Sequence, residues 1–344
     1  MRSAQVTIKD LASRLGISPS TVSRALRDHP DISQETKDAV RELAEELNYE
    51  PNAIALSLQS SKSNIIGLII PEIVHYFFSQ VISGIEDVAY DAGYNVMICQ
   101  SNESYIREVK NVQALVSSRI EGLLVSLSKE TRDFTHFKNL EKKNIPVVFF
   151  DRICEEMETD RVVVDDFKGA YLAVKHLAEI GCKRIAHLGT AEDLQIGKNR
   201  YNGYIKALKE YNLSVDERLI IRCDNNKAAR LVTKRLIYEL NPPDGIFAVN
   251  DLTAIGACQT IKENGLRVPE DIAVVGFSNG IYSTMSDPPL TTVEQFGYLM
   301  GQKSASLLLN RILTEQDYPA ITEQIETNLI IRESTVKRKV YPAQ

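Results

Sequence analysis

The chain has 344 residues, of which 44% are hydrophobic, and a net charge of −6 at pH 7. This length can bury more than one core, and the negative charge excludes a protein that coats nucleic acid non-specifically. No early stretch reads as a signal sequence, and none approaches transmembrane length. The five cysteines are widely spaced without a CxxC pair, as is typical of buried thiols in a reducing compartment. We therefore expect a cytoplasmic protein with no membrane partner.

The segment IKDLASRLGISPSTVSRALR (8–27) has the pattern of two short helices joined by a tight turn. Thr7 and Ser18 are expected N-caps, and Pro19 fits the first turn of the second helix. Gly16 can take the left-handed conformation that ends the first helix. Apolar residues recur at helical spacing in both halves. Together these features predict a helix-turn-helix, whose second helix enters the DNA major groove.

The charges of the first fifty residues are segregated. Residues 1–27 contain five basic side chains and one acid, whereas residues 28–50 contain eight acids and two bases. The cations therefore lie on the helices that would face phosphates, and the acids on a third helix facing away. Arg24 is expected to read a guanine, with a phosphate contact as the alternative. The expected DNA-contacting residues of this domain are Thr7, Ser18, Pro19, Ser20, Thr21, Ser23 and Arg24.

The runs VTIKDLASRLGIS, TVSRAL and NYEPNAIALSL give the chain a resemblance to the LacI/GalR family of bacterial transcription regulators. The resemblance covers essentially the whole chain. It implies that residues 48–58 form a hinge helix, which pairs with its copy in the DNA minor groove. Leu58 would wedge open a base step there, and Asn52 and Ala55 would lie along the same helix. Residues 59–63 have the polar composition of a linker.

From Asn64 onward, short apolar runs such as IIGLII and IAVVGF alternate with stretches of helical spacing. This alternation predicts parallel sheets with helices on both faces. About 270 residues are too many for one such sheet, so we expect two doubly wound lobes with a ligand cleft outside the strand carboxyl ends. The resemblance implies the same α/β core, like that of periplasmic binding proteins, behind an all-α helix-turn-helix headpiece.

The resemblance also implies where the chain divides, which periodicity does not reveal. The helix-turn-helix domain would span residues 1–50, and the hinge helix and linker would span 51–63. Three crossings between the two lobes are expected. Lobe 1, for effector binding and dimerisation, would consist of residues 64–162 plus 292–323. Lobe 2, for effector binding, would consist of residues 163–291 plus 324–335.

The family's effector contacts fall on loops at the expected cleft. The matching positions here are Phe77, Phe78, Asp151, Arg200, Asn250, Asp251, Ser278 and Gln295. Arg200 and Asp251 are suited to bidentate contacts with polar groups, and either phenylalanine to stacking on a sugar or base. The alternatives are that Asp251 caps a helix starting at Leu252, that Arg200 forms an ion pair between the lobes, and that both phenylalanines are core residues, although two adjacent aromatics usually leave one buried and one not.

Two positions depart from the family pattern. Ser278 stands where an aspartate is usual, and Leu194 stands where purine-responsive relatives carry an additional arginine before Arg200. Both departures disfavour a purine corepressor. A sugar or sugar derivative is the expected effector, on the basis of the family.

No residue set predicts catalysis, a metal site or a cofactor. The five histidines lack metal-ligand spacing, and there is no GxGxxG, Walker A or GxSxG motif. The alternative function is a cytoplasmic sugar-binding or carbohydrate-processing α/β protein without regulatory DNA binding, which the helix-turn-helix opposes. We expect a repressor that binds a pseudo-palindromic double-stranded operator as a homodimer, with operator binding controlled by a small-molecule effector. The C-terminal residues show no heptad run for a tetramer.

Overall fold

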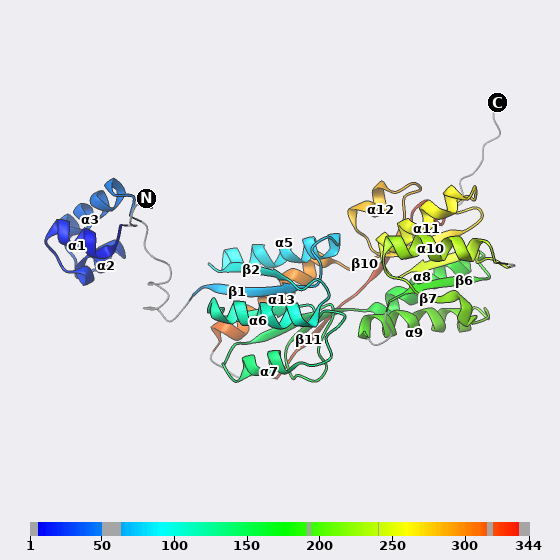
Figure 1. Cartoon of the computed structure of the whole chain (residues 1–344), viewed down its shortest axis with the longest axis horizontal. Coiled ribbons are helices and arrows are strands. Elements are labelled where there is room, and N and C mark those ends of the chain that lie inside the picture. The colour runs from blue at the N-terminus through cyan, green and yellow to red at the C-terminus, as the bar shows by residue number, and fades with distance from the viewer. Residues whose placement is uncertain (1–5, 50–62, 191–193, 240, 315–318, 337–344) are drawn as a thin grey trace, which may run out of the picture. The chain divides into compact units, whose positions relative to one another are not determined.

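The computed structural model describes residues 6–49, 63–190, 194–239, 241–314 and 319–336. The chain forms two compact units, Met1–Asn64 and Ile65–Gln344, which are described separately (Figure 1). The expected hinge residues Asn52, Ala55 and Leu58 lie outside the described residues, so the hinge helix stays a prediction.

The first unit is a bundle of three helices: α1 (Ile8–Leu15), α2 (Pro19–Leu26) and α3 (Gln34–Glu46). Gly16 ends α1 in the left-handed conformation, with φ 65°. The side chains that meet between the helices form one small core, made of Leu11, Ala12, Val22, Ala25, Val40 and Ala44. This arrangement is the predicted helix-turn-helix followed by a third helix.

Side chains fix where these helices begin. The Asp10 carboxylate accepts hydrogen bonds from the Thr7 N–H at 2.8 Å and the Thr7 hydroxyl at 2.7 Å. The Ser18 hydroxyl accepts from the Thr21 N–H at 3.0 Å and so caps α2. These bonds satisfy polar groups that a helix start leaves without partners inside the helix.

The second unit contains two six-stranded sheets, one in each lobe (Figure 1). The strand order is β11-β5-β4-β3-β1-β2 in lobe 1 and β12-β10-β9-β8-β6-β7 in lobe 2. All pairs are parallel except β10 with β12. Lobe 1 consists of β1 (Ile65–Ile70), α5 (Tyr76–Asp91), β2 (Asn95–Gln100), α6 (Tyr105–Ser117), β3 (Gly122–Val125), α7 (Thr135–Glu141), β4 (Val147–Phe150), β5 (Arg161–Val164), α13 (Gly297–Leu313) and β11 (Thr322–Ile325).

Lobe 2 repeats the alternation of strands and helices. Its elements are α8 (Asp166–Glu179), β6 (Ile185–Gly189), α9 (Gln195–Glu210), a 3-10 turn (Glu217–Leu219), β7 (Ile220–Arg222), α10 (Asn226–Ile237), β8 (Gly245–Ala248), α11 (Asp251–Glu263), β9 (Ala273–Ser278), α12 (Ile281–Met285), β10 (Thr291–Glu294) and β12 (Asn328–Ile330). The two doubly wound lobes are the fold expected from the sequence.

The chain crosses between the lobes three times, after β5, β10 and β11. The expected boundaries at 162/163, 291/292 and 323/324 each fall inside one of these strands, so the crossings come later than expected. The reason is that each strand completes its hydrogen-bonded pairing within one sheet before the chain leaves it, and apolar periodicity does not mark that point.

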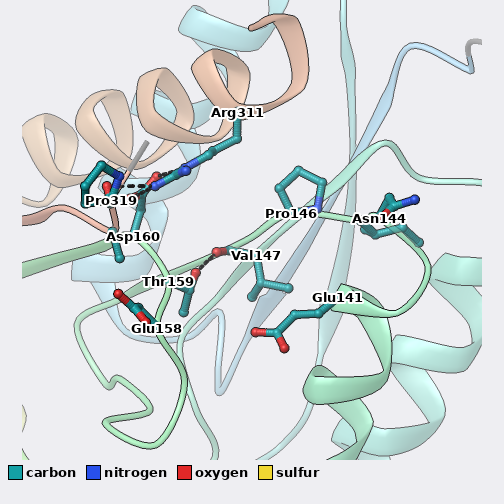
Figure 2. A pocket seen from close by; sticks show the side chains of 11 residues that line it. Glu141, Asn144, Pro146, Val147, Glu158, Thr159, Asp160, Arg311 and Pro319 are labelled. Atoms are coloured by element: carbon teal, nitrogen blue, oxygen red, sulfur yellow. Dashed lines mark hydrogen bonds and ion pairs between the residues drawn. The ribbon is translucent and has the colours of Figure 1, made fainter. Parts of the chain in front are cut away.

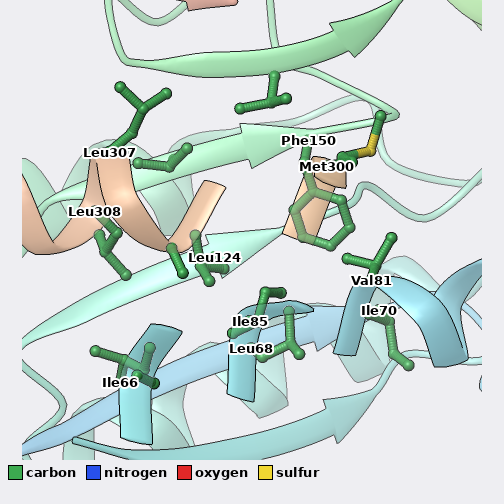
Figure 3. Close-up of a cluster of buried hydrophobic side chains, with 14 of the residues drawn as sticks. Ile66, Leu68, Ile70, Val81, Ile85, Leu124, Phe150, Met300, Leu307 and Leu308 are labelled. Atoms are coloured by element: carbon green, nitrogen blue, oxygen red, sulfur yellow. The ribbon is translucent and has the colours of Figure 1, made fainter. Parts of the chain in front are cut away.

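Close helix packing covers the lobe 1 sheet. Its core contains Ile66, Leu68 and Ile70 of β1 with side chains of α5 and α13 (Figure 3). A Cβ atom on Gly84 of α5 would lie 2.1 Å from the Tyr298 carbonyl oxygen of α13, so these helices touch through backbone. In the described part of the chain, no helix is long and apolar enough to span a bilayer.

Candidate functional site

The expected base-reading residues lie on the surface of α2. Pro19, Ser20 and Arg24 are exposed, whereas Ser23 is partly buried. Among the described residues, Arg24 has no hydrogen-bond or ion-pair partner, so its guanidinium is available to a ligand. The α2 surface therefore presents one long donor with short polar side chains beside it.

Three of the expected DNA contacts already have hydrogen-bonding partners within the unit. The hydroxyls of Ser18 and Thr21 lie 2.8 Å apart, and the Thr7 hydroxyl donates to Asp10. A hydroxyl has both a donor and acceptor lone pairs, so each retains capacity for a further bond. Their first role here is to fix the helix starts.

The cleft between the lobes brings most of the expected effector residues together. Its lining contains Phe77, Phe78, Asp151, Arg200, Asn250, Ser278 and Gln295, joined by His75, Lys129, Arg152, Thr190, Ile196, Asp224 and Val249. Asp251 lies in an adjoining recess instead. The cleft encloses a free volume of about 80 Å³, well below the roughly 300 Å³ at which ligand pockets usually begin. A sugar-sized ligand therefore needs the lobes to part or side chains to move.

Arg200 is held by lobe 2 itself. Its Nε lies 2.7 Å from Asp166 Oδ1, its Nη1 donates to the Val249 carbonyl at 2.6 Å, and its guanidinium carbon lies 3.8 Å from the centre of the Phe277 ring. The side chain is buried. The expected alternative of an ion pair between the lobes is replaced by one within lobe 2, because Asp166 opens α8 beside α9.

Asp166 and Asp151 are buried carboxyls near this guanidinium. Burial raises the pKa of Asp166 to about 6, against the opposing effect of Arg200. Burial likewise raises the pKa of Asp151, although Arg152 and Arg200 oppose it. Asp151 has a single weak hydrogen-bond partner in the described chain, the Ser126 hydroxyl at 3.5 Å. It is the acceptor in the cleft with the most unused capacity.

Asn250 and Asp251 have structural partners. Asn250 caps α11, accepting from the Thr253 N–H at 2.9 Å, and donates to the Asp224 carbonyl. Asp251 is the first residue of α11, so the expected cap at Asp251 is one residue too late. Its carboxylate accepts from the Gly280 N–H at 2.7 Å and the Thr292 hydroxyl at 2.5 Å. Burial raises its pKa to about 6 despite these bonds.

The remaining expected residues line the cleft wall. Phe77 and Phe78 pack edge to face and are 7% and 3% exposed, so both belong to the lobe 1 core, as the alternative for these residues had it, and neither of the two adjacent rings is left exposed. Both rings pack into the core that α5 and α13 form with the lobe 1 sheet. The Ser278 hydroxyl donates to Gln295 Oε1 at 2.7 Å, which ties the β9 loop to the loop after β10.

Sequence reasoning missed the charged residues at the cleft mouth. Lys129 Nζ of lobe 1 lies 2.9 Å from Asp224 Oδ2 of lobe 2, and Arg152 pairs with Glu103 at 2.7 Å. Lys129 follows β3 and Asp224 follows β7, which are positions beyond the carboxyl ends of parallel strands. The rule that ligands bind there could have identified both residues.

A second cavity, of about 680 Å³, lies at the opposite end of lobe 1 (Figure 2). It is formed where β4 and β5 begin, around Pro146 and Thr159. Arg311 of α13 forms a bidentate ion pair with the buried Asp160 there, at 2.7 and 2.8 Å.

Among the described residues, no group of three His, Cys, Asp or Glu side chains could hold a metal ion.

Known protein families account for both parts of the chain. Residues 7–52 match the family model of bacterial regulatory proteins of the lacI family, and residues 174–335 match the periplasmic binding protein-like domain. The ribose operon repressor of Halalkalibacterium halodurans is 35% identical over 96% of this chain and 97% of its own length. The chain belongs to the LacI family of bacterial transcription regulators.

Other relatives of this LacI-family chain agree. The transcriptional repressor PurR of Vibrio atlanticus is 32% identical, over 96% of this chain and 98% of its own. The structure of the Lac repressor dimer bound to operator and the anti-inducer ONPF has a TM-score of 0.85 at 26% identity, covering 97% of this chain and 100% of that chain. A complex of the regulator CelR with cellobiose has a TM-score of 0.73 at 28% identity, with 96% and 100% covered.

These relationships establish the general function. The protein is a DNA-binding transcriptional repressor, not an enzyme, and its periplasmic-binding-protein-like domain binds a small-molecule effector. As a bacterial transcription factor it acts in the cytoplasm, as expected. The alternative of a sugar-binding or carbohydrate-processing protein without regulatory DNA binding is excluded.

Proposed function

We propose that this repressor responds to an uncharged carbohydrate and binds its operator as a homodimer. The observation that carries the effector class is the balance of charge in the cleft. Among the described residues, Arg200 is paired with Asp166 and Arg152 with Glu103, whereas the Asp151 carboxyl group has only the Ser126 hydroxyl at 3.5 Å as a hydrogen-bond partner. A neutral ligand rich in hydroxyl donors hydrogen-bonds Asp151 without bringing a further charge into the buried site.

A purine effector has less support. Leu194, at the position of the additional arginine, precedes α9 and offers no side-chain hydrogen-bond donor. Ser278 supplies a hydroxyl already bonded to Gln295 where a carboxylate is usual. Relatives named as the ribose operon repressor and as a cellobiose complex favour sugars, whereas the relatives named PurR keep a purine as the rival tested below.

The DNA-contacting residues are proposed from the exposed face of α2. Arg24 reads a base, Pro19 and Ser20 lie beside it at the helix start, and the hydroxyls of Thr7, Ser18, Thr21 and Ser23 contact phosphate. One such helix covers one half-site. A two-fold pair of chains is therefore matched to a pseudo-palindromic operator, with Asn52, Ala55 and Leu58 of the hinge at its centre.

Exposed apolar side chains support the homodimer. β2 is an edge strand of the lobe 1 sheet and exposes Met97 and Ile98. Val74, just before α5, is 66% exposed, and Met285 of α12 in lobe 2 is 72% exposed. Large exposed apolar side chains and an open strand edge are unfavourable on a monomer and typical of an interface. We propose that a second copy covers these residues; the similar Lac repressor structure is also a dimer.

Thermal-shift measurements test the effector class directly. The full-length protein is heated with ribose, cellobiose, ribose 5-phosphate or hypoxanthine. A neutral sugar should raise the unfolding midpoint, because a ligand at a hundredfold its Kd stabilises the folded state by about 2.7 kcal/mol. Asp151→Asn should abolish the shift, whereas Asp91→Asn, exposed on α5, should retain it. A shift with hypoxanthine or with the sugar phosphate, and none with neutral sugars, would contradict the proposal.

A further inference from the structure

One ion pair joins the two lobes across the cleft mouth. Lys129 Nζ, from the loop after β3, lies 2.9 Å from Asp224 Oδ2, from the loop after β7. The pair connects segments of different sheets that have no strand pairing with each other. Any separation of the lobes at this point has to lengthen or break it.

Lobe 1 holds Lys129 in place. Glu103 Oε2 accepts from the Lys129 backbone N–H at 2.8 Å, and Glu103 Oε1 lies 3.6 Å from Nζ. Arg152 Nη1 binds both oxygens of Glu103, at 2.9 and 2.7 Å, and anchors that carboxylate. The lysine therefore projects from a fixed base, which lowers the entropy lost when it pairs.

Lobe 2 holds Asp224 in a similar way. The Thr190 hydroxyl donates to Oδ2 at 2.8 Å, and the Asn250 side chain donates to the Asp224 backbone carbonyl at 2.9 Å. Burial alone would raise the pKa of Asp224, but Lys129 and Thr190 outweigh it and keep the pKa below its ordinary value. The carboxylate is thus charged at neutral pH and directed across the mouth.

The cleft behind this pair holds about 80 Å³ of free space. A sugar does not fit into that volume unless the lobes part or side chains move. We propose that Lys129 and Asp224 form an electrostatic clasp that holds the lobes closed, and that effector binding has to work against it. This inference concerns regulation of the proposed effector cleft and rests on that function.

An anion site is the alternative role for Lys129. Asp224 and Glu103 already neutralise the lysine, so an anionic ligand would have to displace a carboxylate that the Thr190 hydroxyl also binds. The side chains of Lys129 and Asp224 are 30% and 23% exposed, so water and salt reach the pair. Its strength should therefore depend on ionic strength, as expected of a clasp near the surface.

The first test measures lobe separation without effector or operator. Nitroxide labels are attached at Lys110→Cys on α6 and Lys209→Cys on α9, in a Cys99→Ser background. Cys99 is replaced because it is partly exposed and would react with the label, whereas the other four thiols are buried. Electron–electron resonance then gives the distance distribution across the cleft, with labelled protein diluted into unlabelled protein so that each distance lies within one chain.

Three variants form a cycle: Lys129→Gln, Asp224→Asn and the double variant. Each should lower the ratio of closed to open protein about two- to fivefold, the range for an exposed ion pair. The double variant should match the single ones, because either change alone removes the pair. High salt should open the parent protein and leave the variants unchanged. Lys138→Gln, which removes a 2.8 Å ion pair with Glu156 inside lobe 1, is the matched control.

Two results would overturn the clasp. One is an unchanged distance distribution in either single variant, and the other is additive opening in the double variant. Because no ligand is present, neither result bears on the proposed effector class.

A second, independent test measures the affinity of each variant for the sugar that raises the unfolding midpoint. A clasp predicts that both single variants bind the sugar two- to fivefold more tightly. Residues that contacted the sugar would weaken binding when truncated, and that result would refute the clasp.

Discussion

Arg200 Nε lies 2.7 Å from Asp166 Oδ1, and both side chains are almost fully buried in lobe 2. The protein thus orients its cleft arginine with its own carboxylate before any ligand arrives. Burial raises the pKa of Asp166 to about 6, although the attraction of the Arg200 guanidinium opposes that shift. Arg200 is consequently part of the fold as well as of the cleft.

Replacement of Arg200 should therefore destabilise the protein even without effector. Arg200→Ala leaves the buried Asp166 carboxylate unpaired, which should lower the free energy of unfolding by about 3–5 kcal/mol. Urea titration followed by circular dichroism measures the change. Arg218→Ala, which removes an exposed arginine paired with Asp216, should cost less than about 1 kcal/mol. Equal costs for the two variants would contradict a structural role for Arg200.

Asp251 should make stability depend on pH in the opposite sense to an ordinary ion-paired acid. Its folded pKa of about 6 lies above the unfolded value of roughly 3.9. The folded state therefore binds the proton more tightly than the unfolded state. The resulting contribution to the free energy of unfolding is fully present below about pH 3.9 and is lost as the pH rises through about 6.

Comparison with Asp251→Asn isolates that contribution. The stability of the parent relative to this variant should be about 2–3 kcal/mol greater at pH 4 than at pH 7, as measured by urea titration at both values. The exposed Asp91→Asn is the control for general acid effects. A relative stability that falls on acidification would reverse the sign and contradict the raised pKa.

Arg24 should carry sequence preference in operator binding. Arg24→Ala should weaken binding to a specific site by about 1–3 kcal/mol and relax the preference at one base position in each half-site. Arg14→Ala, on the exposed surface of α1, should weaken binding to all sequences alike if that residue touches DNA at all. Selection of bound sequences from a random library gives both results. An unchanged base preference in Arg24→Ala would assign Arg24 to phosphate instead.

Gly84 should be intolerant of any side chain. Its Cβ would lie 2.1 Å from the Tyr298 carbonyl oxygen, so Gly84→Ala has to push α5 and α13 apart. We expect a loss of at least about 1–3 kcal/mol in thermal or urea unfolding. Ser83→Ala, one residue away on the exposed side of α5, should change stability little. Similar stability of the two variants would mean that the helices pack less closely than described.

The fold and the cleft were predictable from the sequence to different degrees. Caps at Thr7 and Ser18 and the turn at Gly16 act locally, so the helix-turn-helix could be read from adjacent residues. The alternation of apolar runs and helices gave the two sheets, but the crossings near Asp165 and Phe296 depend on which strands pair across long sequence distances.

The partners of the cleft residues were not predictable for the same reason. Asp166 and Arg200 are brought together by the packing of α8 on α9, and Lys129 meets Asp224 only where the two lobes approach each other. Composition and spacing identify charged side chains, but they do not say which of them are neutralised by a partner. The balance of charge in the cleft, on which the effector class depends, emerges only from the fold.

Operator binding with and without sugar tests whether a neutral sugar controls this repressor. A fluorescent operator, chosen by selection from random DNA, is titrated with the full-length protein in the presence of ribose, cellobiose or hypoxanthine, and anisotropy reports the affinity. We expect a two-fold symmetric site bound by two chains. A neutral sugar should change the operator affinity at least about fivefold, which corresponds to a coupling free energy of about 1 kcal/mol between sugar and operator binding. An affinity that no neutral sugar changes, but that hypoxanthine does, would contradict this expectation.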